Sequence, residues 1–168
     1  MKKILPLTLI LFLQYLLANE PTLALLRNIN TNTQQQLSIG EYHFICNAYG
    51  VLGTTQILER ENLNESCKEQ LLLFYKKNPL SSYYAKRTLH AQQLYHIDFK
   101  EQQCLMYVQG QRTLSELLLE EGLVVLKPHF KDKEFFAPFT RAYESAVFQR
   151  KGVHKDGVLR ECFAEFYK

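Results

Sequence analysis

The residues most suggestive of chemistry lie in a short polar stretch, NINTNT, at positions 28–33. Polar turn residues at alternate positions, directly after an apolar segment, are typical of loops that bind a metal ion. Such loops normally carry aspartates, because a hard cation such as calcium prefers anionic oxygen ligands. Here every candidate ligand is an amide. The stretch is therefore either a metal-binding turn without its charge or an ordinary turn, in which asparagine tolerates left-handed backbone.

A second group of candidate residues is formed by the cysteines, Cys46, Cys67, Cys104 and Cys162. None has C-x-x-C spacing or a histidine at metal-ligand spacing, which argues against a zinc site. In an exported protein, an even number spread over the domain indicates two disulfides. Three pairings are possible, and we favour Cys46–Cys67 with Cys104–Cys162, because the first closes a loop of about 20 residues, worth roughly 3 kcal/mol. The alternative is that these are free buried thiols.

The remaining histidines and aromatic residues fit ordinary structural roles. Surface or half-buried positions are expected for His43, His90, His96, His129 and His154. Some aromatic residues could stack nucleic-acid bases on a sheet face, although packing within the protein is the more common use of such side chains. These residues are Tyr42, Phe44, Tyr83, Tyr84 and Tyr95.

The N-terminal residues have the layout of a secretory signal rather than of a folded domain. A basic head with Lys2 and Lys3 precedes a run of 15 apolar-rich residues that ends at Ala18. A membrane span needs about 20 apolar residues, so we expect a signal peptide over residues 1–18, cleaved after Ala18. The expected domain then covers residues 19–168, and the protein is periplasmic or secreted without a transmembrane anchor.

Cleavage also changes the electrostatics. Removing two lysines lowers the formal net charge from +3 to +1. Proteins that grip nucleic acid through its phosphates usually show a clear positive excess, and this chain has none. The composition, 46% hydrophobic and 22% charged in 168 residues, is that of one globular domain.

These candidate residues must be positioned by a small α+β domain with a barrel core. Strand patterns flank Gly40 as in a hairpin, Pro79 ends the first long helix, and Thr113 with Glu116 forms a capping box. Gly122 suits the left-handed end of the following helix. The expected order is a strand or short helix at 22–29, strands at 34–39 and 41–49, a helix at 62–78, strands at 89–99 and 104–109, a helix at 114–121, a strand at 123–126 and a helix at 133–151.

The C-terminal half, CLMYVQGQRTLSELLLEEGLVVLKPHF followed by TRAYESAVFQRKGVHK, resembles staphylococcal nuclease-like (thermonuclease-like) domains. The resemblance covers about residues 88–155 and includes spacing as well as residue type. It implies a five-stranded OB-fold barrel with three helices. It also implies phosphodiester hydrolysis, with calcium held by two aspartates and a backbone carbonyl, a glutamate that activates water, and two arginines that bind phosphate.

The N-terminal half can be aligned with the same family, whose metal turn reads IDGDT where this chain has INTNT at 29–33. The family's charged groups then fall on uncharged residues. The metal aspartates fall on Asn32 and Gly50, the carbonyl donor on Val51 and the glutamate near Gly53. The arginines fall on Ile45 or Cys46, and on Gln103.

We therefore expect a catalytically degenerate domain that needs no cofactor and binds an envelope protein. The alternative is an active secreted nuclease with a shifted calcium site, built from Glu59, Glu61 or Asp98 with Arg87 or Arg112. A third possibility is a single-stranded nucleic-acid binder that does not cleave. The first hypothesis rests on the loss of every charged group at the matched positions, since calcium requires carboxylates and a phosphate requires cations.

Overall fold

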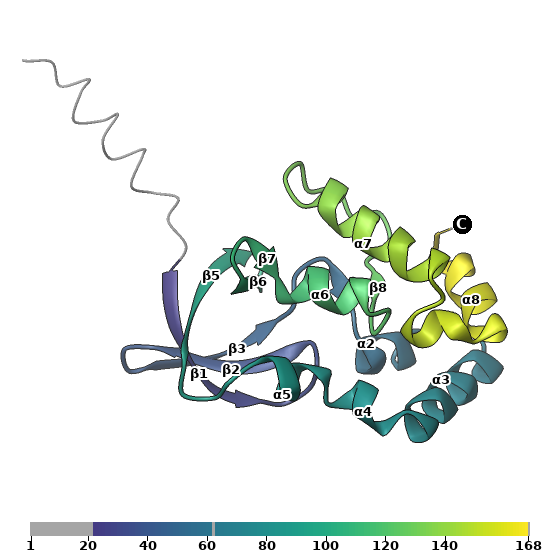
Figure 1. Ribbon diagram of the computed structural model, residues 1–168, viewed down its shortest axis with the longest axis horizontal. Helices are drawn as coiled ribbons and strands as arrows, with labels where there is room; N and C mark the ends of the chain where they lie inside the picture. The colour runs from purple at the N-terminus through teal and green to yellow at the C-terminus, as the bar shows by residue number, and fades with distance from the viewer. Residues whose placement is uncertain (1–21, 62, 168) are drawn as a thin grey trace, which may run out of the picture.

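A computed structural model describes residues 22–61 and 63–167 as an α+β domain (Figure 1). The expected signal peptide at 1–18 lies outside the described residues. The main sheet has six antiparallel strands in the order β3-β2-β1-β5-β6-β7. These are β1 Thr22–Ile29, β2 Gln34–Ile39, β3 Tyr42–Asn47, β5 Leu94–Lys100, β6 Gln103–Gln109 and β7 Arg112–Thr113. A second, two-stranded sheet pairs β4 Val51–Leu52 with β8 Val125–Leu126.

The helices lie mainly beyond one end of the sheet and over one of its faces (Figure 1). Seven α-helices are seen in the described ranges. They are α2 Thr54–Leu58, α3 Glu65–Lys77, α4 Pro79–Ser82, α5 Tyr84–Thr88, α6 Leu114–Glu120, α7 Phe136–Phe148 and α8 Gly157–Ala164. Short 3-10 helices follow at Gly152–Lys155 and Glu165–Tyr167.

Local sequence signals explain several of these boundaries. The β2–β3 hairpin turns at Gly40, whose φ of +58° is readily adopted by glycine. The Thr113 hydroxyl accepts a hydrogen bond from the Glu116 amide at 3.2 Å and so caps α6. The helix ends at Gly122 with φ of +64°, and the Leu123 amide donates to the Leu118 carbonyl at 2.9 Å, as in a Schellman motif.

The sheet curls, so that β3 and β6 meet although they are not neighbours in the strand order. Ala48 forms a parallel bridge with Cys104, and the Cys46–Cys104 disulfide joins the two strands beside it. The contact stops there, because the chain turns away at Gly50, where φ is +72°. The described residues therefore contain no continuous ladder that closes the sheet into a barrel, which is a more open arrangement than expected.

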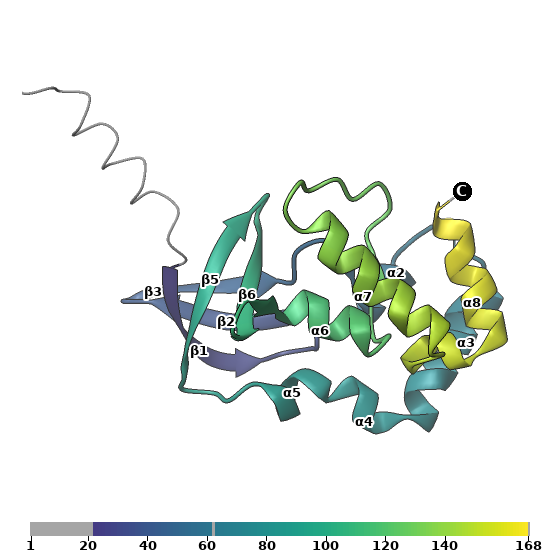
Figure 2. The same cartoon turned by 45° about the horizontal axis from the view of Figure 1, so that its top comes forward.

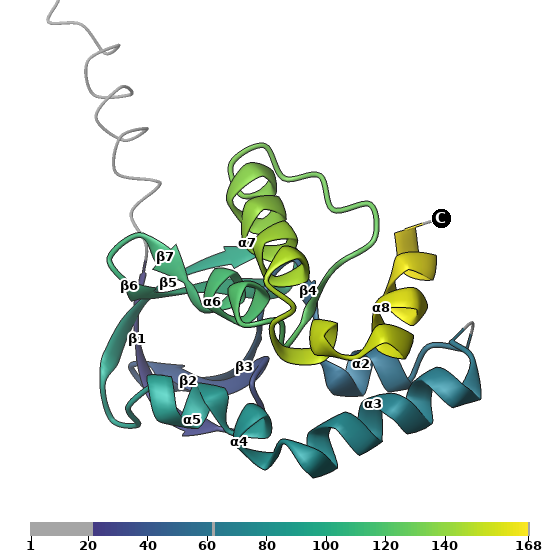
Figure 3. The same ribbon diagram turned by 45° about the vertical axis from the view of Figure 1, so that its right-hand side comes forward.

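Two hydrophobic clusters stabilise the domain. The larger lies inside the curled sheet and beneath α6 and α7, which pack against each other (Figure 2). The smaller lies between α3 and α8, which run side by side beyond the sheet (Figure 3) and are joined by the Cys67–Cys162 disulfide. Tyr143 on α7 packs against both clusters and so connects them.

The favoured disulfide pairing was wrong. Cys46 pairs with Cys104 and Cys67 with Cys162, with Cα–Cα separations of 5.6 and 5.9 Å. The favoured pairing followed distance along the chain, whereas the pairing found follows which elements meet in space. Both disulfides fit an oxidising, extracytoplasmic compartment.

The helical content also differs from the three helices expected. Helices α3, α6 and α7 match expected positions, but α2 forms where neither a helix nor a strand was expected. The span 79–88 folds into α4 and α5, and the strand expected at 89–99 shortens to β5. Pro79 both ends α3 and occupies the first turn of α4, where its missing amide costs no hydrogen bond. Among the described residues, no helix is long and apolar enough to cross a membrane.

Candidate functional site

A partly enclosed cavity of about 290 Å³ lies beside the 28–33 stretch. It is lined by residues 30–33, residues 53–55, Tyr75, residues 82–83 and residues 123–124. We call it the threonine cleft, because the 28–33 turn brings Thr31 and Thr33 to it and the start of α2 brings Thr54 and Thr55. None of the described residues that line it is charged. The cleft therefore occupies the place of the expected metal turn and contains amide, hydroxyl and apolar groups only.

Asn32 is fixed by two hydrogen bonds to distant backbone groups. Its Nδ2 donates to the Ser81 carbonyl at 2.7 Å, and its Oδ1 accepts from the Ala85 amide at 3.0 Å. The two partners, one an acceptor and one a donor, determine which way the amide points. Asn32 thus ties the turn to α4 and α5. An aspartate could accept from Ala85 but could not donate to Ser81, so the amide has a structural reason of its own.

Gly53 allows the loop before α2 to approach the turn closely. A Cβ at this position would lie 2.5 Å from Thr33 Oγ1, which is too close for two non-bonded atoms. The Gly53 amide donates a hydrogen bond to Gln56 Oε1 at 2.7 Å, which caps the short helix. A glutamate here would clash with Thr33, so this backbone path leaves no room for the family's general base at position 53.

The deep and outer parts of the cleft differ in character. Leu123 and Val124 form a buried apolar floor. The Tyr75 hydroxyl donates to the Leu123 carbonyl at 2.9 Å, and burial raises the pKa of Tyr75. Tyr83 lies at the outer edge, 51% exposed, with Lys86 Nζ 5.7 Å from its ring centroid. The cleft therefore offers an apolar base and an aromatic rim around its polar wall.

Two further family positions are buried in packing. A Cβ on Gly50 would lie 2.7 Å from Phe130 Cε2, and the residue has φ of +72°. Val51 is fully buried and pairs with Leu126 in the small sheet. Neither residue presents an oxygen-bearing side chain, and a carboxylate at position 50 would displace the Phe130 ring. Packing against Phe130 therefore explains why position 50, which the resemblance matches to a metal aspartate, is a glycine.

The positions matched to the phosphate-binding arginines lie on β3 and β6. Ile45 is exposed on β3, whereas its neighbour Cys46 is buried in the disulfide to Cys104. Gln103 precedes that cysteine, and its Nε2 donates to the Ala48 carbonyl at 3.5 Å. The two strands thus meet where the family places its arginines, but a disulfide and an amide occupy the junction.

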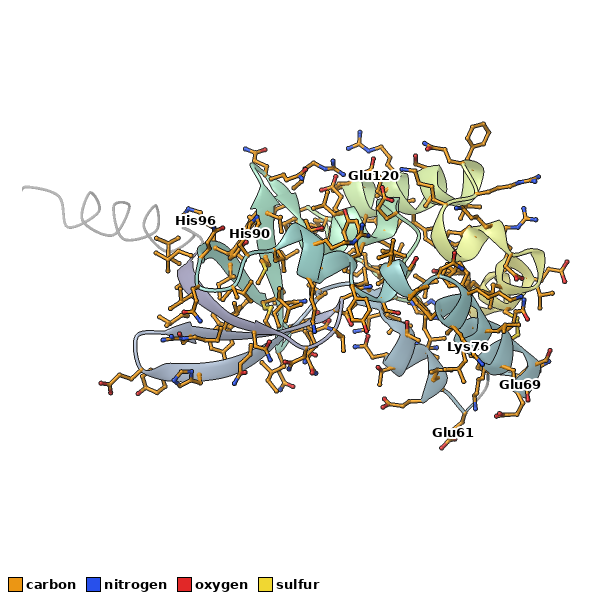
Figure 4. The ribbon with its side chains drawn as sticks, turned by 60° about the horizontal axis from the view of Figure 1, so that its bottom comes forward. Glu61, Glu69, Lys76, His90, His96 and Glu120 are labelled. Atoms are coloured by element: carbon orange, nitrogen blue, oxygen red, sulfur yellow. A yellow bond between two sulfur atoms is a disulfide. The ribbon has the colours of Figure 1, made fainter. Side chains whose placement is uncertain are left out.

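The charged residues of the alternative nuclease site are dispersed over the described structure. Arg112 is ion-paired with Glu116 and Glu120, and Arg87 donates to the Leu80 carbonyl. Figure 4 shows Glu61 well apart from Glu120. His90 and His96 lie on yet another part of the surface (Figure 4). No group of three or more acidic, histidine or cysteine residues within 22–61 and 63–167 could hold a metal ion.

Two polar side chains outside the cleft were not singled out by their sequence context. The Tyr49 hydroxyl donates to Asp132 Oδ2 at 3.0 Å, and burial together with that carboxylate raises the pKa of Tyr49 to about 12. Asp132 also accepts from the amides of Glu134 and Phe135, which ties the loop before α7 to the end of β3. Of the two residues, only Asp132 has a sequence signal. An aspartate often accepts hydrogen bonds from backbone amides two and three residues later, at the turn before a helix.

His154 was expected at the surface or half buried, and this was wrong. His154 is 1% exposed, and its Nε2 has no hydrogen-bond partner within the described residues. Its ring lies edge-on to the Tyr143 ring, with the two ring centroids 5.3 Å apart. Burial, followed by the charge of Arg160, lowers the pKa of His154 to about 4. It is therefore neutral in the folded protein at neutral pH and behaves as a core residue.

Comparison of the chain with models of protein families finds no matching family, and comparison with curated proteins finds no matching relative. The resemblance to thermonuclease-like domains therefore rests on the residues quoted for it in the sequence.

Proposed function

We propose that this protein is an exported binding module built on a thermonuclease-like OB barrel that has lost its hydrolytic machinery. One observation carries the proposal: the cavity beside the 28–33 turn is lined without any charged residue. A phosphodiesterase of this type needs carboxylates for calcium and for the attacking water, and cations for the phosphate. Hydroxyl groups and amides supply none of these.

The strand arrangement supports the barrel assignment. An OB fold is a five-stranded, partly open barrel. The order β3-β2-β1-β5-β6, with β6 returning to β3 through the Ala48–Cys104 bridge, is consistent with such a barrel. The disulfide beside that bridge holds the two strands together where regular pairing is short. On this proposal, β7, β4 and β8 are additions to the barrel.

The packing around the turn supports the proposal that small side-chain movements would not restore hydrolysis. Asn32 is held by Ser81 and Ala85, and the Gly53 position touches Thr33. A carboxylate at position 32 would face the Ser81 carbonyl without a hydrogen bond, and one at position 53 would collide with Thr33. The proposed protein therefore binds rather than cleaves.

Hydrolysis is tested by incubating the purified, oxidised domain with fluorescently labelled single-stranded DNA and millimolar calcium. The expected result is intact DNA in the presence and absence of a chelator. Calcium-dependent cleavage that a chelator abolishes would instead favour the alternative active nuclease. A wild-type thermonuclease assayed alongside shows that the conditions support cleavage.

Nucleic-acid binding without cleavage is tested by fluorescence anisotropy of the same oligonucleotide. Electrostatic binding weakens steeply with salt. Because the expected domain carries a formal charge of only +1, we expect no increase in the anisotropy of the oligonucleotide even at low salt. An increase in anisotropy that disappears as salt is added would favour a nucleic-acid binder over the proposed module.

The proposed partner is an envelope protein, and the proposed location is the periplasm or the exterior of the cell. Cross-linking of the epitope-tagged protein in intact cells, followed by identification of the cross-linked species, tests both. The two disulfides fit this location. Recovery of the protein in the reduced, cytoplasmic fraction would contradict it.

A further inference from the structure

We infer that the threonine cleft is a binding site for a neutral saccharide. The inference rests on the proposed function, because a cleft that retained calcium and arginines would instead take a phosphodiester. A saccharide would bind the proposed module in addition to its protein partner. Three features carry it: free hydroxyl groups on the wall, an apolar floor with a tyrosine at the rim, and the absence of charge.

The hydroxyl groups on the wall are available to a ligand. Within the described structure, the side-chain hydroxyls of Thr33, Thr55 and Ser82 make no hydrogen bond to another protein group, although all three line the cavity. Each can donate one hydrogen bond and accept others. A sugar hydroxyl has the same dual capacity. Three such hydroxyl groups in the lining of one cavity therefore complement a ring that carries several hydroxyl groups of its own.

The backbone around these hydroxyls is held in place before any ligand binds. Asn32 fixes the turn to α4, and the Gly53 backbone rests against Thr33. Tyr75 is tied to Leu123 from the opposite side. A site whose walls are already ordered loses little conformational entropy on binding. The geometry thus favours recognition of a small, rigid ligand.

The apolar part of the cleft can pack against the C–H groups on the faces of a sugar ring. Leu123 and Val124 are 5% and 1% exposed and form the floor, while Tyr83 extends from the rim. Sugar rings carry C–H groups on their faces as well as hydroxyls at their edges, so they pack on aliphatic and aromatic surfaces. One face of Tyr83 is near Lys86, which leaves the ring's other face for a ligand.

The size and neutrality of the cleft exclude competing ligand classes. Its volume of about 290 Å³ is just below the roughly 300–1,000 Å³ of small-molecule pockets, so a large ligand would not fit inside it. A phosphate or carboxylate buried here would lack a cation to offset its loss of hydration. A nucleobase gains most by stacking on aromatic faces, and Tyr83 alone among the lining residues offers an exposed ring.

The test uses two-dimensional amide NMR of the oxidised domain with a panel of neutral monosaccharides and disaccharides made of glucose, galactose, mannose or N-acetylglucosamine, because a cavity of about 290 Å³ suits a ligand of that size. We expect at least one to shift the amides of residues 30–33, 53–55 and 82–83 in a saturable manner. Shifts produced by adenosine or inorganic phosphate, with none from any sugar, would overturn the inference. So would a flat response to the whole panel from a protein whose spectrum is folded.

Variants separate a specific site from weak surface contact. Thr55→Val and Ser82→Ala remove one free hydroxyl each, and Tyr83→Ala removes the rim. Each is expected to weaken binding about fivefold to tenfold, as loss of one neutral hydrogen bond or ring contact does. The matched controls are Ser66→Ala and Tyr42→Ala, which alter exposed residues outside the cleft. Equal binding by all five variants would contradict the site.

The two proposals fail in different ways. Cleavage of DNA by the same preparation would contradict the proposed function whatever the sugars do. Absence of sugar binding, with DNA left intact, would contradict only the saccharide site. The folded spectrum of each variant confirms that a loss of binding comes from the altered side chain.

Discussion

Asn32 shows how one atom changes the role of a turn. A carboxylate and an amide have nearly the same shape, but only the amide can donate a hydrogen bond. In this protein the donated bond to the Ser81 carbonyl and the accepted bond from the Ala85 amide span 49 and 53 residues of the chain. The uncharged turn is therefore positioned by what the amide does, which a metal-binding aspartate would not do.

Replacing Asn32 by aspartate tests this role. The Asn32→Asp variant faces the Ser81 carbonyl with an anionic oxygen, so we expect the free energy of unfolding to fall by about 1–3 kcal/mol. Urea denaturation followed by circular dichroism measures the change. Asn30→Asp, at an exposed position in the same turn, is the matched control and should change stability by less than about 0.5 kcal/mol. Equal losses in both would contradict the role given to Asn32.

His154 should make stability depend on pH in a defined window. Its pKa is lowered to about 4 in the folded protein, whereas an unperturbed histidine has a pKa near 6.5. Between these values the unfolded chain binds the proton more readily, so stability falls as pH decreases from about 6.5 to about 4. The integrated loss is about 3 kcal/mol.

The measurement is the urea midpoint across that pH range for the wild type and for His154→Leu. We expect the variant to lose most of the slope, whatever its absolute stability, because leucine does not titrate. A wild-type midpoint that stays constant over the whole range would show that the buried imidazole is not responsible for any pH dependence.

At the level of elements, the close contact between the end of α6 and the segment after α7 depends on glycine. Gly122 has φ of +64°, and a Cβ there would collide with the Lys151 carbonyl. The Val153 amide donates to the Gly122 carbonyl at 2.9 Å, so the two chain segments touch through backbone atoms. This contact places His154 and the chain leading to α8.

The Gly122→Ala variant should therefore lose more unfolding free energy than a variant that introduces only left-handed backbone strain. We expect a loss of more than about 3 kcal/mol, from left-handed strain plus the backbone collision. Gly110→Ala is the matched control, because Gly110 has φ of +62° but no atom that a Cβ would meet within 4 Å. It should lose about 1 kcal/mol. Thermal unfolding of the two variants under identical conditions gives the comparison.

Elements with strong local signals were predictable from the sequence, and those that depend on context were not. Helices α3 and α7 follow apolar periodicity, and α6 has its Thr113 cap and Gly122 end. Helix α2 has only five residues and no apolar stripe, and it is stabilised by Gln56 capping the Gly53 amide. The strand at 89–99 shortened because residues 90–93 form a turn that bonds to β1 through Leu26. In the first case a local cap forms a helix too short to show periodicity, and in the second case a long-range contact overrides weak local propensity.

At the scale of the whole molecule, each disulfide stabilises a different half. The Cys46–Cys104 bond joins β3 to β6 across the curled sheet, and the Cys67–Cys162 bond joins α3 to α8. Their sequence separations are 58 and 95 residues. Long loops of this kind are worth about 4–5 kcal/mol each in the chain-entropy model, at the upper end of measured values.

Peptide mapping of the unreduced protein tests the pairing directly. Proteolysis without reduction should yield one linked species containing Cys46 and Cys104 and a second containing Cys67 and Cys162, both lost on reduction. Species linking Cys46 to Cys67 would contradict the fold. The Cys67→Ala/Cys162→Ala double variant should in addition lose about 2–5 kcal/mol of stability, measured by urea denaturation against the wild type.

The candidate site was only partly visible in the sequence. The absence of charge at Asn32, Gly50 and Gly53 could be seen in the sequence itself. The hydroxyl wall could not, because Thr33, Thr55 and Ser82 come from three segments that meet only in the folded chain. Nothing local to any of them distinguishes a ligand-facing hydroxyl from an ordinary turn residue.

The sequence by itself determined the features that depend on near neighbours: the periodic helices, the glycine turns, the hairpin around Gly40 and the absence of charge in the 28–33 stretch. Only the tertiary structure decided which cysteines pair, that Asn32 is bound to Ser81 and Ala85, and that the 28–33 turn and the start of α2 line one cavity. The physical reason is the range of the interactions. Propensity and capping act within a few residues, whereas these contacts require chain closure over tens of residues, which the packing of the whole core stabilises.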